Sequence, residues 1–577
     1  MEVKLAKTAG FCMGVRRALE RVLAEANRRK GPIYTYGPLI HNEQVMKLLE
    51  TKGVTVLGGV KGIKEGTLVI RAHGIPPSER KLLKSSGLKL IDATCPRVAR
   101  VQALIRYHAG KGYLAVIVGE RDHAEVIGLK GHGNGMAHVV GIAEEVERLP
   151  QAEKVIVVAQ TTQERDRFES VVRAVQNRFP GALIFDTICD ATRSRQDEVR
   201  ALAPHVDAIV VVGGYHSGNT RRLAQVAQAT GLPVFHVETE EELERERLSA
   251  MEVVGVTAGA STPNWMIRKV VQKIESVRTR KERRMGRWMR HVFKFLFQSN
   301  LIVAAGAFCL CHGAVLLSGR RPGLLHPALA FFYVYAVHVM NRLLDKGAST
   351  YNDPERAHFY IRRRPALIVS AVLSIMAALF LAGSIGLGAS IAVAGLILLG
   401  ALYSLPIVPQ SRRHLWRYSK IKDIPGSKTL SQALAWGAVI ALLPLIEPYP
   451  PLWSASLTAF IFVFSVVYVR SALFDIFQVQ GDLIVGAETL PITLGEKRTL
   501  LLLKGVIAGG AVILSASALS GVAGPFAYLL PLCYATLALC LITYEKQWLH
   551  PGTPLEALVE GNLFLAGLLG LLWQWLK

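Results

Sequence analysis

A series of long apolar segments fills the second half of this 577-residue chain. Hydrophobic residues make up 51% of the sequence and the mean hydropathy is +0.31, which is too apolar for a purely soluble enzyme of this size. The chain is therefore predicted to be a membrane protein with a large soluble part. The candidate spans, nine in number, are 299–318, 325–341, 366–387, 389–406, 432–447, 454–474, 500–519, 523–543 and 559–576.

Residues 1–277 show a different pattern, in which short β-rich runs alternate with amphipathic helical stretches. Runs such as LAVIVG, KVIVVAQ and AIVVVGG are typical of buried parallel strands in α/β proteins. The N-terminus lacks the apolar core and cleavage site of a secretory signal, so none is expected. We expect a soluble α/β domain over 1–277, a basic linker over 278–298 and an all-helical membrane domain over 299–577.

The linker is strongly basic. Eight lysines or arginines lie within residues 278–294, directly before the first predicted span. That position favours contact with lipid headgroups, although a solvated linker helix would have the same composition. If this segment is cytoplasmic, the loops 342–365 and 407–431 are internal too, and each carries six lysines or arginines. We therefore expect an inner-membrane protein whose soluble domain faces the cytoplasm.

The charge balance of the whole chain points to an anionic partner. Lysine and arginine exceed aspartate and glutamate by 23, which suits a phosphorylated substrate or a membrane surface. Charged residues are 19% of the chain, too few for a mainly disordered protein. Seven cysteines are too few and too far apart for a disulfide scaffold.

Three of the cysteines lie in the soluble part, and each follows a predicted strand and begins a predicted helix. They are Cys12, Cys95 and Cys189, at spacings of 83 and 94 residues. The repeated context predicts three pseudo-equivalent α/β units, each with a thiol where the helix dipole lowers its pKa. Three converging thiolates would hold either zinc together with a histidine, as in a hydrolase, or an iron–sulfur cluster with one open iron. The alternative is three unrelated small core residues.

Polar residues near the ends of other predicted strands favour an anionic substrate. His41, His73 and His123 follow apolar runs, where open α/β sheets place ligands, and Glu125 lies two residues after the third histidine. Hydroxyl, amide and glycine groups that can bind phosphate oxygens occur at Thr161, Ser217, Gly218, Asn219 and Ser261.

Residues 1–277 resemble the LytB/IspH family, 4-hydroxy-3-methylbut-2-enyl diphosphate reductases of the non-mevalonate isoprenoid pathway. The matching stretches are AGFCMGVRRA, YTYGPLIHN, VIRAHG, DATCP, AQTT, DTICDATRSRQ, GGYHSGNTRRLA and GVTAGASTP. The resemblance implies that Cys12, Cys95 and Cys189 hold a [4Fe-4S] cluster. The sequence departs from the family at Gly218, where members often have serine and where a backbone amide could still bind diphosphate.

The same resemblance implies roles for the polar residues. The three histidines, Ser217, Asn219 and Ser261 would bind the substrate diphosphate, Glu125 would donate a proton and Thr161 would relay it. The fourth iron would bind the allylic hydroxyl, and two electrons from a ferredoxin- or flavodoxin-like donor would give isopentenyl or dimethylallyl diphosphate. Neither a nicotinamide cofactor nor a nucleic acid is expected, and the chain lacks the GxGxxG spacing at the likeliest strand ends.

Polar and acidic residues end two of the predicted spans on one membrane face. Asn341 and Asp345 lie four residues apart, and Asp475 and Asp482 follow the sixth span. Acidic residues on facing helix ends suit Mg²⁺ that bridges to a diphosphate. Ordinary capping at the interface would explain either pair alone.

Residues 290–577 resemble the UbiA-type intramembrane prenyltransferases, which have nine spans and two aspartate-rich motifs. The tail GAETLPITLG matches well, but NRLLDKGAS stands where the family commonly shows NDxxDxxxD. Arg342, Ser349 and Gln478 occupy positions that are commonly acidic, and Asp353 is the candidate to replace one missing acid. The resemblance implies a prenyl diphosphate ligand with Mg²⁺. The alternative is a binding or anchoring module without turnover, because the changes reduce the negative charge.

Overall fold

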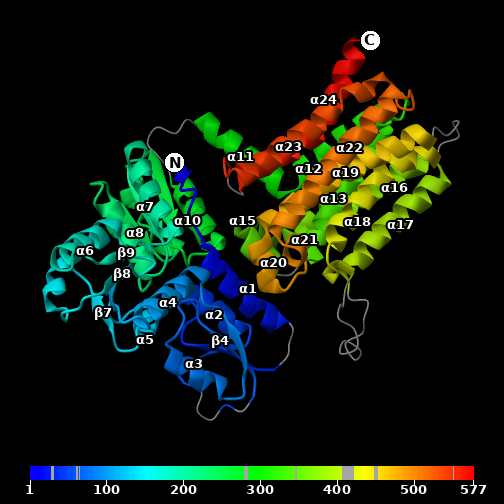
Figure 1. Cartoon of the computed structure of the whole chain (residues 1–577). Coiled ribbons are helices and arrows are strands. Elements are labelled where there is room, and N and C mark those ends of the chain that lie inside the picture. Colours follow the sequence, from blue (N-terminus) through cyan, green and yellow to red (C-terminus); the bar gives the residue numbers. More distant parts are fainter. Residues whose placement is uncertain are drawn as a thin grey trace. The chain divides into compact units, whose positions relative to one another are not determined.

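The computed structural model describes the whole chain except residues 28–30, 60–62, 64, 278–283, 322, 345–346, 406–420, 447–452, 550–551 and 577. The chain divides into two compact units, Met1–Glu282 and Arg283–Lys577 (Figure 1). The first unit is α/β and the second is helical, as the sequence predicts.

The first unit contains three separate four-stranded sheets in which every pair of neighbours is parallel. The strands are β1 Glu2–Leu5, β2 Ile33–Tyr36, β3 Val54–Leu57, β4 Thr67–Ile70, β5 Lys89–Asp92, β6 Leu114–Val118, β7 Ala137–Val140, β8 Val155–Ala159, β9 Leu183–Phe185, β10 Ala208–Val212, β11 Val234–Val237 and β12 Val253–Ala258. The sheet orders are β1-β12-β10-β11, β3-β2-β4-β5 and β7-β6-β8-β9.

Helices connect the strands, because parallel strands require crossover connections. They are α1 Met13–Asn27, α2 Glu43–Thr51, α3 Pro77–Lys84, α4 Pro96–Ala109, α5 Ala124–Gly131, α6 Arg165–Arg178, α7 Asp190–Leu202, α8 Gly218–Gln228, α9 Arg245–Leu248 and α10 Asn264–Ser276. Every residue of β4, β6, β8 and β10 is buried. This burial explains why these strands are continuous apolar runs in the sequence.

The three sheets are built alike around the cysteines. The strands that precede Cys12, Cys95 and Cys189 are β1, β5 and β9, and each is an edge strand of its sheet. Each cysteine N–H donates to a carbonyl in the loop that follows the neighbouring strand β12, β4 or β8. The acceptors are Ala260 O at 3.0 Å, Ala72 O at 2.9 Å and Thr161 O at 2.8 Å, respectively. The predicted three pseudo-equivalent units are therefore present in the structure.

The second unit is a bundle of helices around a large apolar core, with a smaller apolar cluster beside it. Its main packing partners are α12 with α24, α13 with α16, α12 with α13, and α18 with α19. The helices are α11 Arg284–Gln298, α12 Leu301–Leu317, α13 Leu325–Leu344, α14 Ala348–Asn352, α15 Pro354–Arg362, α16 Arg364–Ile385, α17 Leu387–Ser404, α18 Ser427–Gly437, α19 Trp453–Phe477, α20 Val479–Val485, α21 Leu490–Leu494, α22 Glu496–Leu519, α23 Pro531–Glu545 and α24 Thr553–Leu576.

Six helices among the described residues are long and apolar enough to cross a membrane, and a seventh span results if one bent helix pair is counted. The expected number of nine is not confirmed. Helix α13, which contains two histidines, Asn341 and Arg342, does not count as a span. The apolar stretch Leu387–Tyr403 of α17 is shorter than a span.

Part of the predicted basic linker forms α11, which packs on α15. Lys294 forms an ion pair with Glu355, and the rings of Phe295 and Phe359 lie 5.9 Å apart. At Asn300, whose φ is 64°, the chain turns by 72° from the end of α11 into α12. This helix therefore runs across the axis of the first apolar helix.

Candidate active site

One cavity of the first unit is lined by residues from all three sheets. Every residue that the sequence singles out for the reductase site lines it: Cys12, His41, His73, Cys95, His123, Glu125, Thr161, Cys189, Ser217, Gly218, Asn219 and Ser261. They come together because parallel strands of each sheet end at the same edge.

Each cysteine lies immediately before a helix. Cys95 and Cys189 are the N-cap residues of α4 and α7. The Sγ atom of Cys12 accepts a hydrogen bond of 3.5 Å from the Val15 N–H at the start of α1. All three are free thiols that line the cavity.

Gly14 allows the first turn of α1 to approach two of these thiols. A Cβ atom on Gly14 would lie 2.5 Å from Cys95 Sγ and 3.9 Å from Cys12 Sγ. The first distance is far below van der Waals contact, so any side chain here would displace Cys95. Gly14 thus brings the cysteines of two different sheets into one space.

The three Sγ atoms do not all lie within 4.8 Å of one another. Tetrahedral zinc with Zn–S bonds of about 2.3 Å places its sulfurs about 3.8 Å apart. Among the described residues, the one group of three or more His, Cys, Asp or Glu ligand atoms within 4.8 Å of one another is His41, His73 and His123. The three sulfurs are therefore more spread out than a zinc ion requires, which fits the larger [4Fe-4S] cluster.

The pKa of the Cys95 thiol shifts in the opposite direction from the expected one. Burial raises the pKa of its thiol, and this effect outweighs the hydrogen bonds from the backbone N–H groups of Arg97 and Val98. The lowering expected from the helix dipole is therefore wrong for this cysteine.

The three histidines form a compact cluster in the cavity lining. Ring centroids are 4.7 Å apart for His41 and His73, 5.7 Å for His41 and His123, and 5.5 Å for His73 and His123. The Nε2 atom of His41 and the Nδ1 atom of His73 are buried and have no hydrogen-bond partner among the described residues. Buried ring nitrogens without partners are costly, so they indicate a ligand for the cluster.

The histidines are neutral near pH 7. Burial lowers the pKa of His41, lowers that of His73 further and lowers that of His123 to about 4. The Nδ1 atom of His123 accepts a hydrogen bond from the Glu125 N–H at 3.1 Å, so the ring proton is assigned to Nε2. The neutral ring can therefore donate that proton in a hydrogen bond.

Glu125 is a buried carboxyl group held by one residue. Thr161 donates to it twice, from its N–H to Oε1 at 2.7 Å and from its Oγ1 to Oε2 at 2.8 Å. Burial raises the pKa of Glu125, while the bonds from Thr161 and the charge of Arg222 oppose the rise. A carboxyl with a raised pKa next to a hydroxyl is suited to proton transfer.

Hydroxyl and amide side chains line the cavity at the start of α8 and after β12. Ser217 is the N-cap of this helix and its Oγ accepts from the Thr220 N–H at 3.4 Å. The Nδ2 atom of Asn219 has no hydrogen-bond partner in the described part of the chain. Ser261 Oγ donates to the carbonyl oxygen of His41 at 3.1 Å. Helix N-termini of this kind attract anions.

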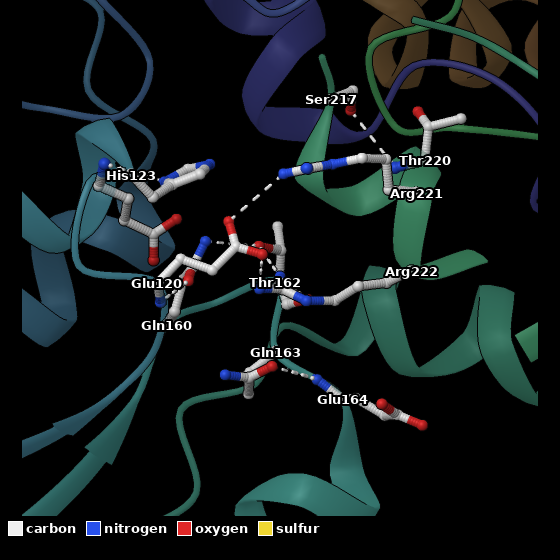
Figure 2. Close-up of polar contacts among 11 residues, drawn as sticks. Glu120, His123, Gln160, Thr162, Gln163, Glu164, Ser217, Thr220, Arg221 and Arg222 are labelled. Carbon is white, nitrogen blue, oxygen red and sulfur yellow. Dashed lines mark hydrogen bonds and ion pairs between the residues drawn. The ribbon is translucent and has the colours of Figure 1, made fainter. Parts of the chain in front are cut away.

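An arginine network centred on the buried Arg222, which sequence reasoning missed, joins α8 to the loops after β6 and β8. Figure 2 shows Glu120 between Arg221 and Arg222. The Arg222 guanidinium bonds to Glu120 Oε1 at 2.9 Å, to the carbonyl of Thr162 at 2.6 Å and to its Oγ1 at 2.9 Å. The network fixes Ser217 and His123 on adjoining loops. The two adjacent arginines after Ser217 were its only signal in the sequence.

The expected metal residues of the second unit are already engaged. Asp475 is buried and its two oxygens accept from Lys428 Nζ and from Thr429 Oγ1, both at 2.7 Å. No three His, Cys, Asp or Glu ligand atoms of the described residues gather within 4.8 Å in this unit. Asn341 is at the end of α13 and Asp345 lies outside the described residues. Among the described residues, these side chains are therefore not gathered into a metal site, and the expected Mg²⁺ site stays a prediction.

Asn352, rather than Asp353, faces the second acidic motif. The Asn352 side chain donates to Asp482 Oδ1 at 2.8 Å and accepts from the Gly481 N–H at 3.0 Å. Asp353 instead caps α15, where its carboxylate accepts from the Arg356 N–H at 3.1 Å. The side chain of Asp353 is thus used locally, and the proposed replacement of the missing acid by this residue is not supported.

Comparison with known proteins gives a match for each unit. The 4-hydroxy-3-methylbut-2-enyl diphosphate reductase of Geobacter sulfurreducens is 44% identical over 282 residues, which are 49% of this chain and 100% of that protein. The chain belongs to this reductase family. The family model "LytB protein" matches residues 3–275, and the model "VviA prenyltransferase" matches residues 339–573. Most of the second unit of this reductase-family chain is therefore similar to the VviA prenyltransferase model.

Further relatives and solved structures match parts of the chain. The reductase of Oleidesulfovibrio alaskensis is 45% identical over 281 residues, covering 48% of this chain and 100% of that protein. The structure of the Plasmodium falciparum reductase has 30% identity and a TM-score of 0.45, and covers 47% of this chain and 87% of that one. A UbiA homolog from Archaeoglobus fulgidus, solved with DMAPP and Mg²⁺, has 16% identity and a TM-score of 0.34, and covers 48% and 98%.

The departure of this reductase-family member at Gly218 leaves room for a side chain. A Cβ atom there would meet nothing closer than 3.7 Å, where its neighbours are Glu120 and His123. Glycine is therefore not required by packing at the start of α8. A serine would fit beside the His123 ring.

Proposed function

We propose that the first unit removes the hydroxyl group of (E)-4-hydroxy-3-methylbut-2-enyl diphosphate by reduction. The reaction consumes two electrons and two protons, breaks the allylic C–O bond and yields water with isopentenyl or dimethylallyl diphosphate. The observation that carries this proposal is the single cavity lined by three free cysteines, three neutral histidines and the Glu125–Thr161 pair. The identity to named reductases over the full length of this unit supports it.

Cys12, Cys95 and Cys189 would hold a [4Fe-4S] cluster, and their wide spacing fits this group. When bound, the cluster supplies the electrons and an open iron for the substrate hydroxyl. The electrons would come from a ferredoxin- or flavodoxin-like donor.

The histidine cluster and the start of α8 would bind the diphosphate. Its oxygens would accept hydrogen bonds from His41, His73 and His123. Each ring is neutral and has one N–H group that can donate such a bond. Ser217, the Gly218 amide, Asn219 and Ser261 would complete the set at a helix N-terminus.

Glu125 would supply a proton to the departing hydroxyl. Its buried carboxyl has a raised pKa, and Thr161 Oγ1 lies 2.8 Å from it as the group that returns the proton. In Glu125→Gln we expect turnover to fall about 10²–10⁴-fold while iron content and substrate binding persist. Turnover close to wild type would place the proton donor elsewhere.

The experiment that tests the function is anaerobic purification of the full chain in detergent. We expect a brown protein with about four irons per chain that reduces the substrate with reduced methyl viologen as electron source. Serine in place of any one of the three cysteines should remove most of the iron and the activity. Stoichiometric zinc instead of iron would refute the proposal.

For the second unit, the engagement of Asp475 by Lys428 and Thr429 favours a membrane module that anchors the reductase or binds a prenyl chain without turnover. The test is binding of prenyl diphosphates by the full chain in lipid, with and without Mg²⁺. Under this proposal binding does not depend on Mg²⁺. Mg²⁺-dependent binding that Asp475→Asn or Asp482→Asn abolishes would instead establish the prenyltransferase site.

The apolar helices and the prenyltransferase-like domain indicate a membrane protein. We place the first unit in the cytoplasm, because the segments that are rich in lysine and arginine would then be internal. Protease treatment of inside-out membrane vesicles should release the first unit. Its protection in those vesicles would reverse the orientation.

A further inference from the structure

Arg195 is a buried cation on α7, six residues after Cys189. Its side chain is 4% exposed. The guanidinium donates from Nη1 to the carbonyl of Ala191 at 2.7 Å and from Nη2 to the carbonyl of Gly10 at 2.6 Å. No carboxylate accepts a hydrogen bond from it in these contacts.

The two carbonyls belong to the loops of two different cysteines. Gly10 lies two residues before Cys12, in the loop after β1, and Ala191 lies two residues after Cys189, at the start of α7. Strands β1 and β9, which lead to these loops, are edge strands of separate sheets. One side chain therefore ties two of the three cysteine loops together across 185 residues of sequence.

Among the described residues, the guanidinium of Arg195 bonds to carbonyl oxygens and not to a carboxylate. The groups whose negative charge favours the charged guanidinium are Cys12, Cys189 and Glu198, while burial lowers its pKa. The Glu198 carboxylate already accepts from the Lys7 and Thr8 N–H groups and from Thr8 Oγ1 at 2.5, 2.8 and 2.6 Å. Glu198 is thus held by its own neutral donors, and Cys12 and Cys189 are the other acidic groups that favour the charge of Arg195.

The Nε atom of Arg195 adds a second sign of a missing partner. It is buried and has no hydrogen-bond partner in the part of the chain that the structure describes. A buried N–H donor on a charged group destabilises the fold when it has no hydrogen-bond acceptor. Buried cations are usually paired with an anion. Both observations are explained if the group that the cysteines hold is negatively charged and accepts hydrogen bonds.

We propose that Arg195 is a positioning residue and counter-cation for the cluster that Cys12, Cys95 and Cys189 hold. Its two hydrogen bonds set the separation of the Cys12 and Cys189 loops, and its charge raises the reduction potential of the cluster. This inference rests on the proposed reductase function and adds a residue to which that function assigns no role.

The two roles can be separated by substitution. Reduction adds an electron to a group already bound by three thiolates, so a buried positive charge nearby favours the reduced state. Arg195→Gln removes the charge and one of the hydrogen bonds. Arg195→Lys keeps the charge but cannot span two carbonyls with a planar fork.

Arg193→Gln is the matched control. Arg193 lies on the same helix two residues earlier, is about one-third exposed and pairs with Asp186 at 2.5 Å. This substitution removes the same charge from the same helix and leaves the contacts to Gly10 and Ala191 in place. The full chain would be prepared anaerobically in lipid nanodiscs, with iron counted after gel filtration and the midpoint potential measured by redox titration followed by electron paramagnetic resonance.

We expect Arg195→Gln to have a more negative midpoint potential than wild type and to lose iron during gel filtration. Arg195→Lys should lose iron but keep the wild-type potential in the clusters that remain, and Arg193→Gln should match wild type in both. Wild-type potential and iron content in Arg195→Gln would overturn the proposal. If that variant fails to fold, full iron retention by Arg195→Lys would overturn the loop-tying role. A wild-type chain without iron would instead refute the proposed reductase function itself.

Discussion

At Gly14 a single added carbon atom should displace one of the three cysteines that line the cavity. In Gly14→Ala the new Cβ would lie 2.5 Å from Cys95 Sγ, so the thiol or the first turn of α1 must move. We expect the anaerobically purified variant to hold clearly less iron than wild type, as measured by iron and sulfide analysis. Gly181→Ala is the control, since nothing lies within 4 Å of a Cβ there. Full iron content in Gly14→Ala would show that the close contact is relieved at no cost.

The neutral histidines predict a pH dependence of diphosphate binding. Burial lowers all three pKa values, that of His123 to about 4, and a bound anion should raise them by favouring the charged rings. The complex then holds more protons than the free chain, so affinity should increase as the pH falls from 7 towards 5.5. Calorimetry with inorganic diphosphate in buffers of different ionisation enthalpy should show proton uptake.

A histidine outside the cavity provides the control for this measurement. His132 is also buried with a lowered pKa, but it bonds to the carbonyl of Gly128 at 2.8 Å and does not line the cavity. His132→Gln should keep the proton uptake, whereas His73→Asn should reduce it. Proton release on binding would contradict the assignment of neutral rings.

The sequence identifies the residues that line the cavity but not those that hold them in place. Cys95 or His123 can be recognised because each follows an apolar strand run. Arg195 and Arg222 cannot, because their carbonyl partners Gly10 and Thr162 are 185 and 60 residues away in the sequence. Contacts of this range depend on how the three sheets meet, which no local pattern encodes.

At the scale of elements, α11 exposes large apolar side chains although its sequence is rich in basic residues. Trp288, Met289 and Phe293 are 63%, 60% and 45% exposed, although one end of the helix packs on α15. The 72° turn into α12 would set α11 close to the membrane plane if α12 crosses the bilayer. Apolar exposure together with many basic residues is typical of a helix that lies in the headgroup region.

Fluorescence quenching tests this placement of α11. In nanodiscs with lipids brominated near the headgroup, the wild-type chain should be quenched more than Trp288→Phe, because Trp288 would lie at that depth. Trp265→Phe in the first unit, where the side chain is 8% exposed, should keep the wild-type difference. Equal quenching in wild type and Trp288→Phe would mean that α11 stays in water.

Elements were easier to predict than their number. The strands of the first unit were clear from continuous apolar runs, because both faces of those strands are buried. The number of membrane spans was harder to predict from the sequence. Apolar residues also fill α13 and the short stretch Leu387–Tyr403, and neither of these counts as a full span. The use of Asp353 as a helix cap also required the structure.

At the scale of the whole molecule, the buried ion pair of Arg470 and Glu560 tests whether the two units are stable independently. The bonds are 2.8 Å from Nε to Oε2 and 2.5 Å from Nη2 to Oε1, with both residues at most 5% exposed. Arg470→Met leaves a buried carboxylate unpaired and should destabilise the helical unit by about 3–5 kcal/mol. Reaction of the buried thiols Cys311 and Cys533 with a fluorescent maleimide during heating measures that loss.

The reductase activity of Arg470→Met, assayed with reduced methyl viologen at a temperature where the variant remains folded, should equal that of wild type. The reason is that the cavity is formed within the first unit. The double variant Arg470→Met, Glu560→Leu is the matched control and should recover part of the stability, since no charge is then left unpaired. If reductase activity is lost at the same temperature at which the helical unit unfolds, the two units are coupled.

The pairing of β1 with β12 has a consequence for how the protein is made. These strands are the first and the last of the first unit, so the sheet that carries Cys12 cannot close until Ala258 has left the ribosome. Only about 40 residues separate Ala258 from Leu301, where the first apolar helix begins. At about 5–20 residues per second, translation covers that distance in about 2–8 s. Iron is therefore expected to reach the three cysteines on chains that have already been delivered to the membrane.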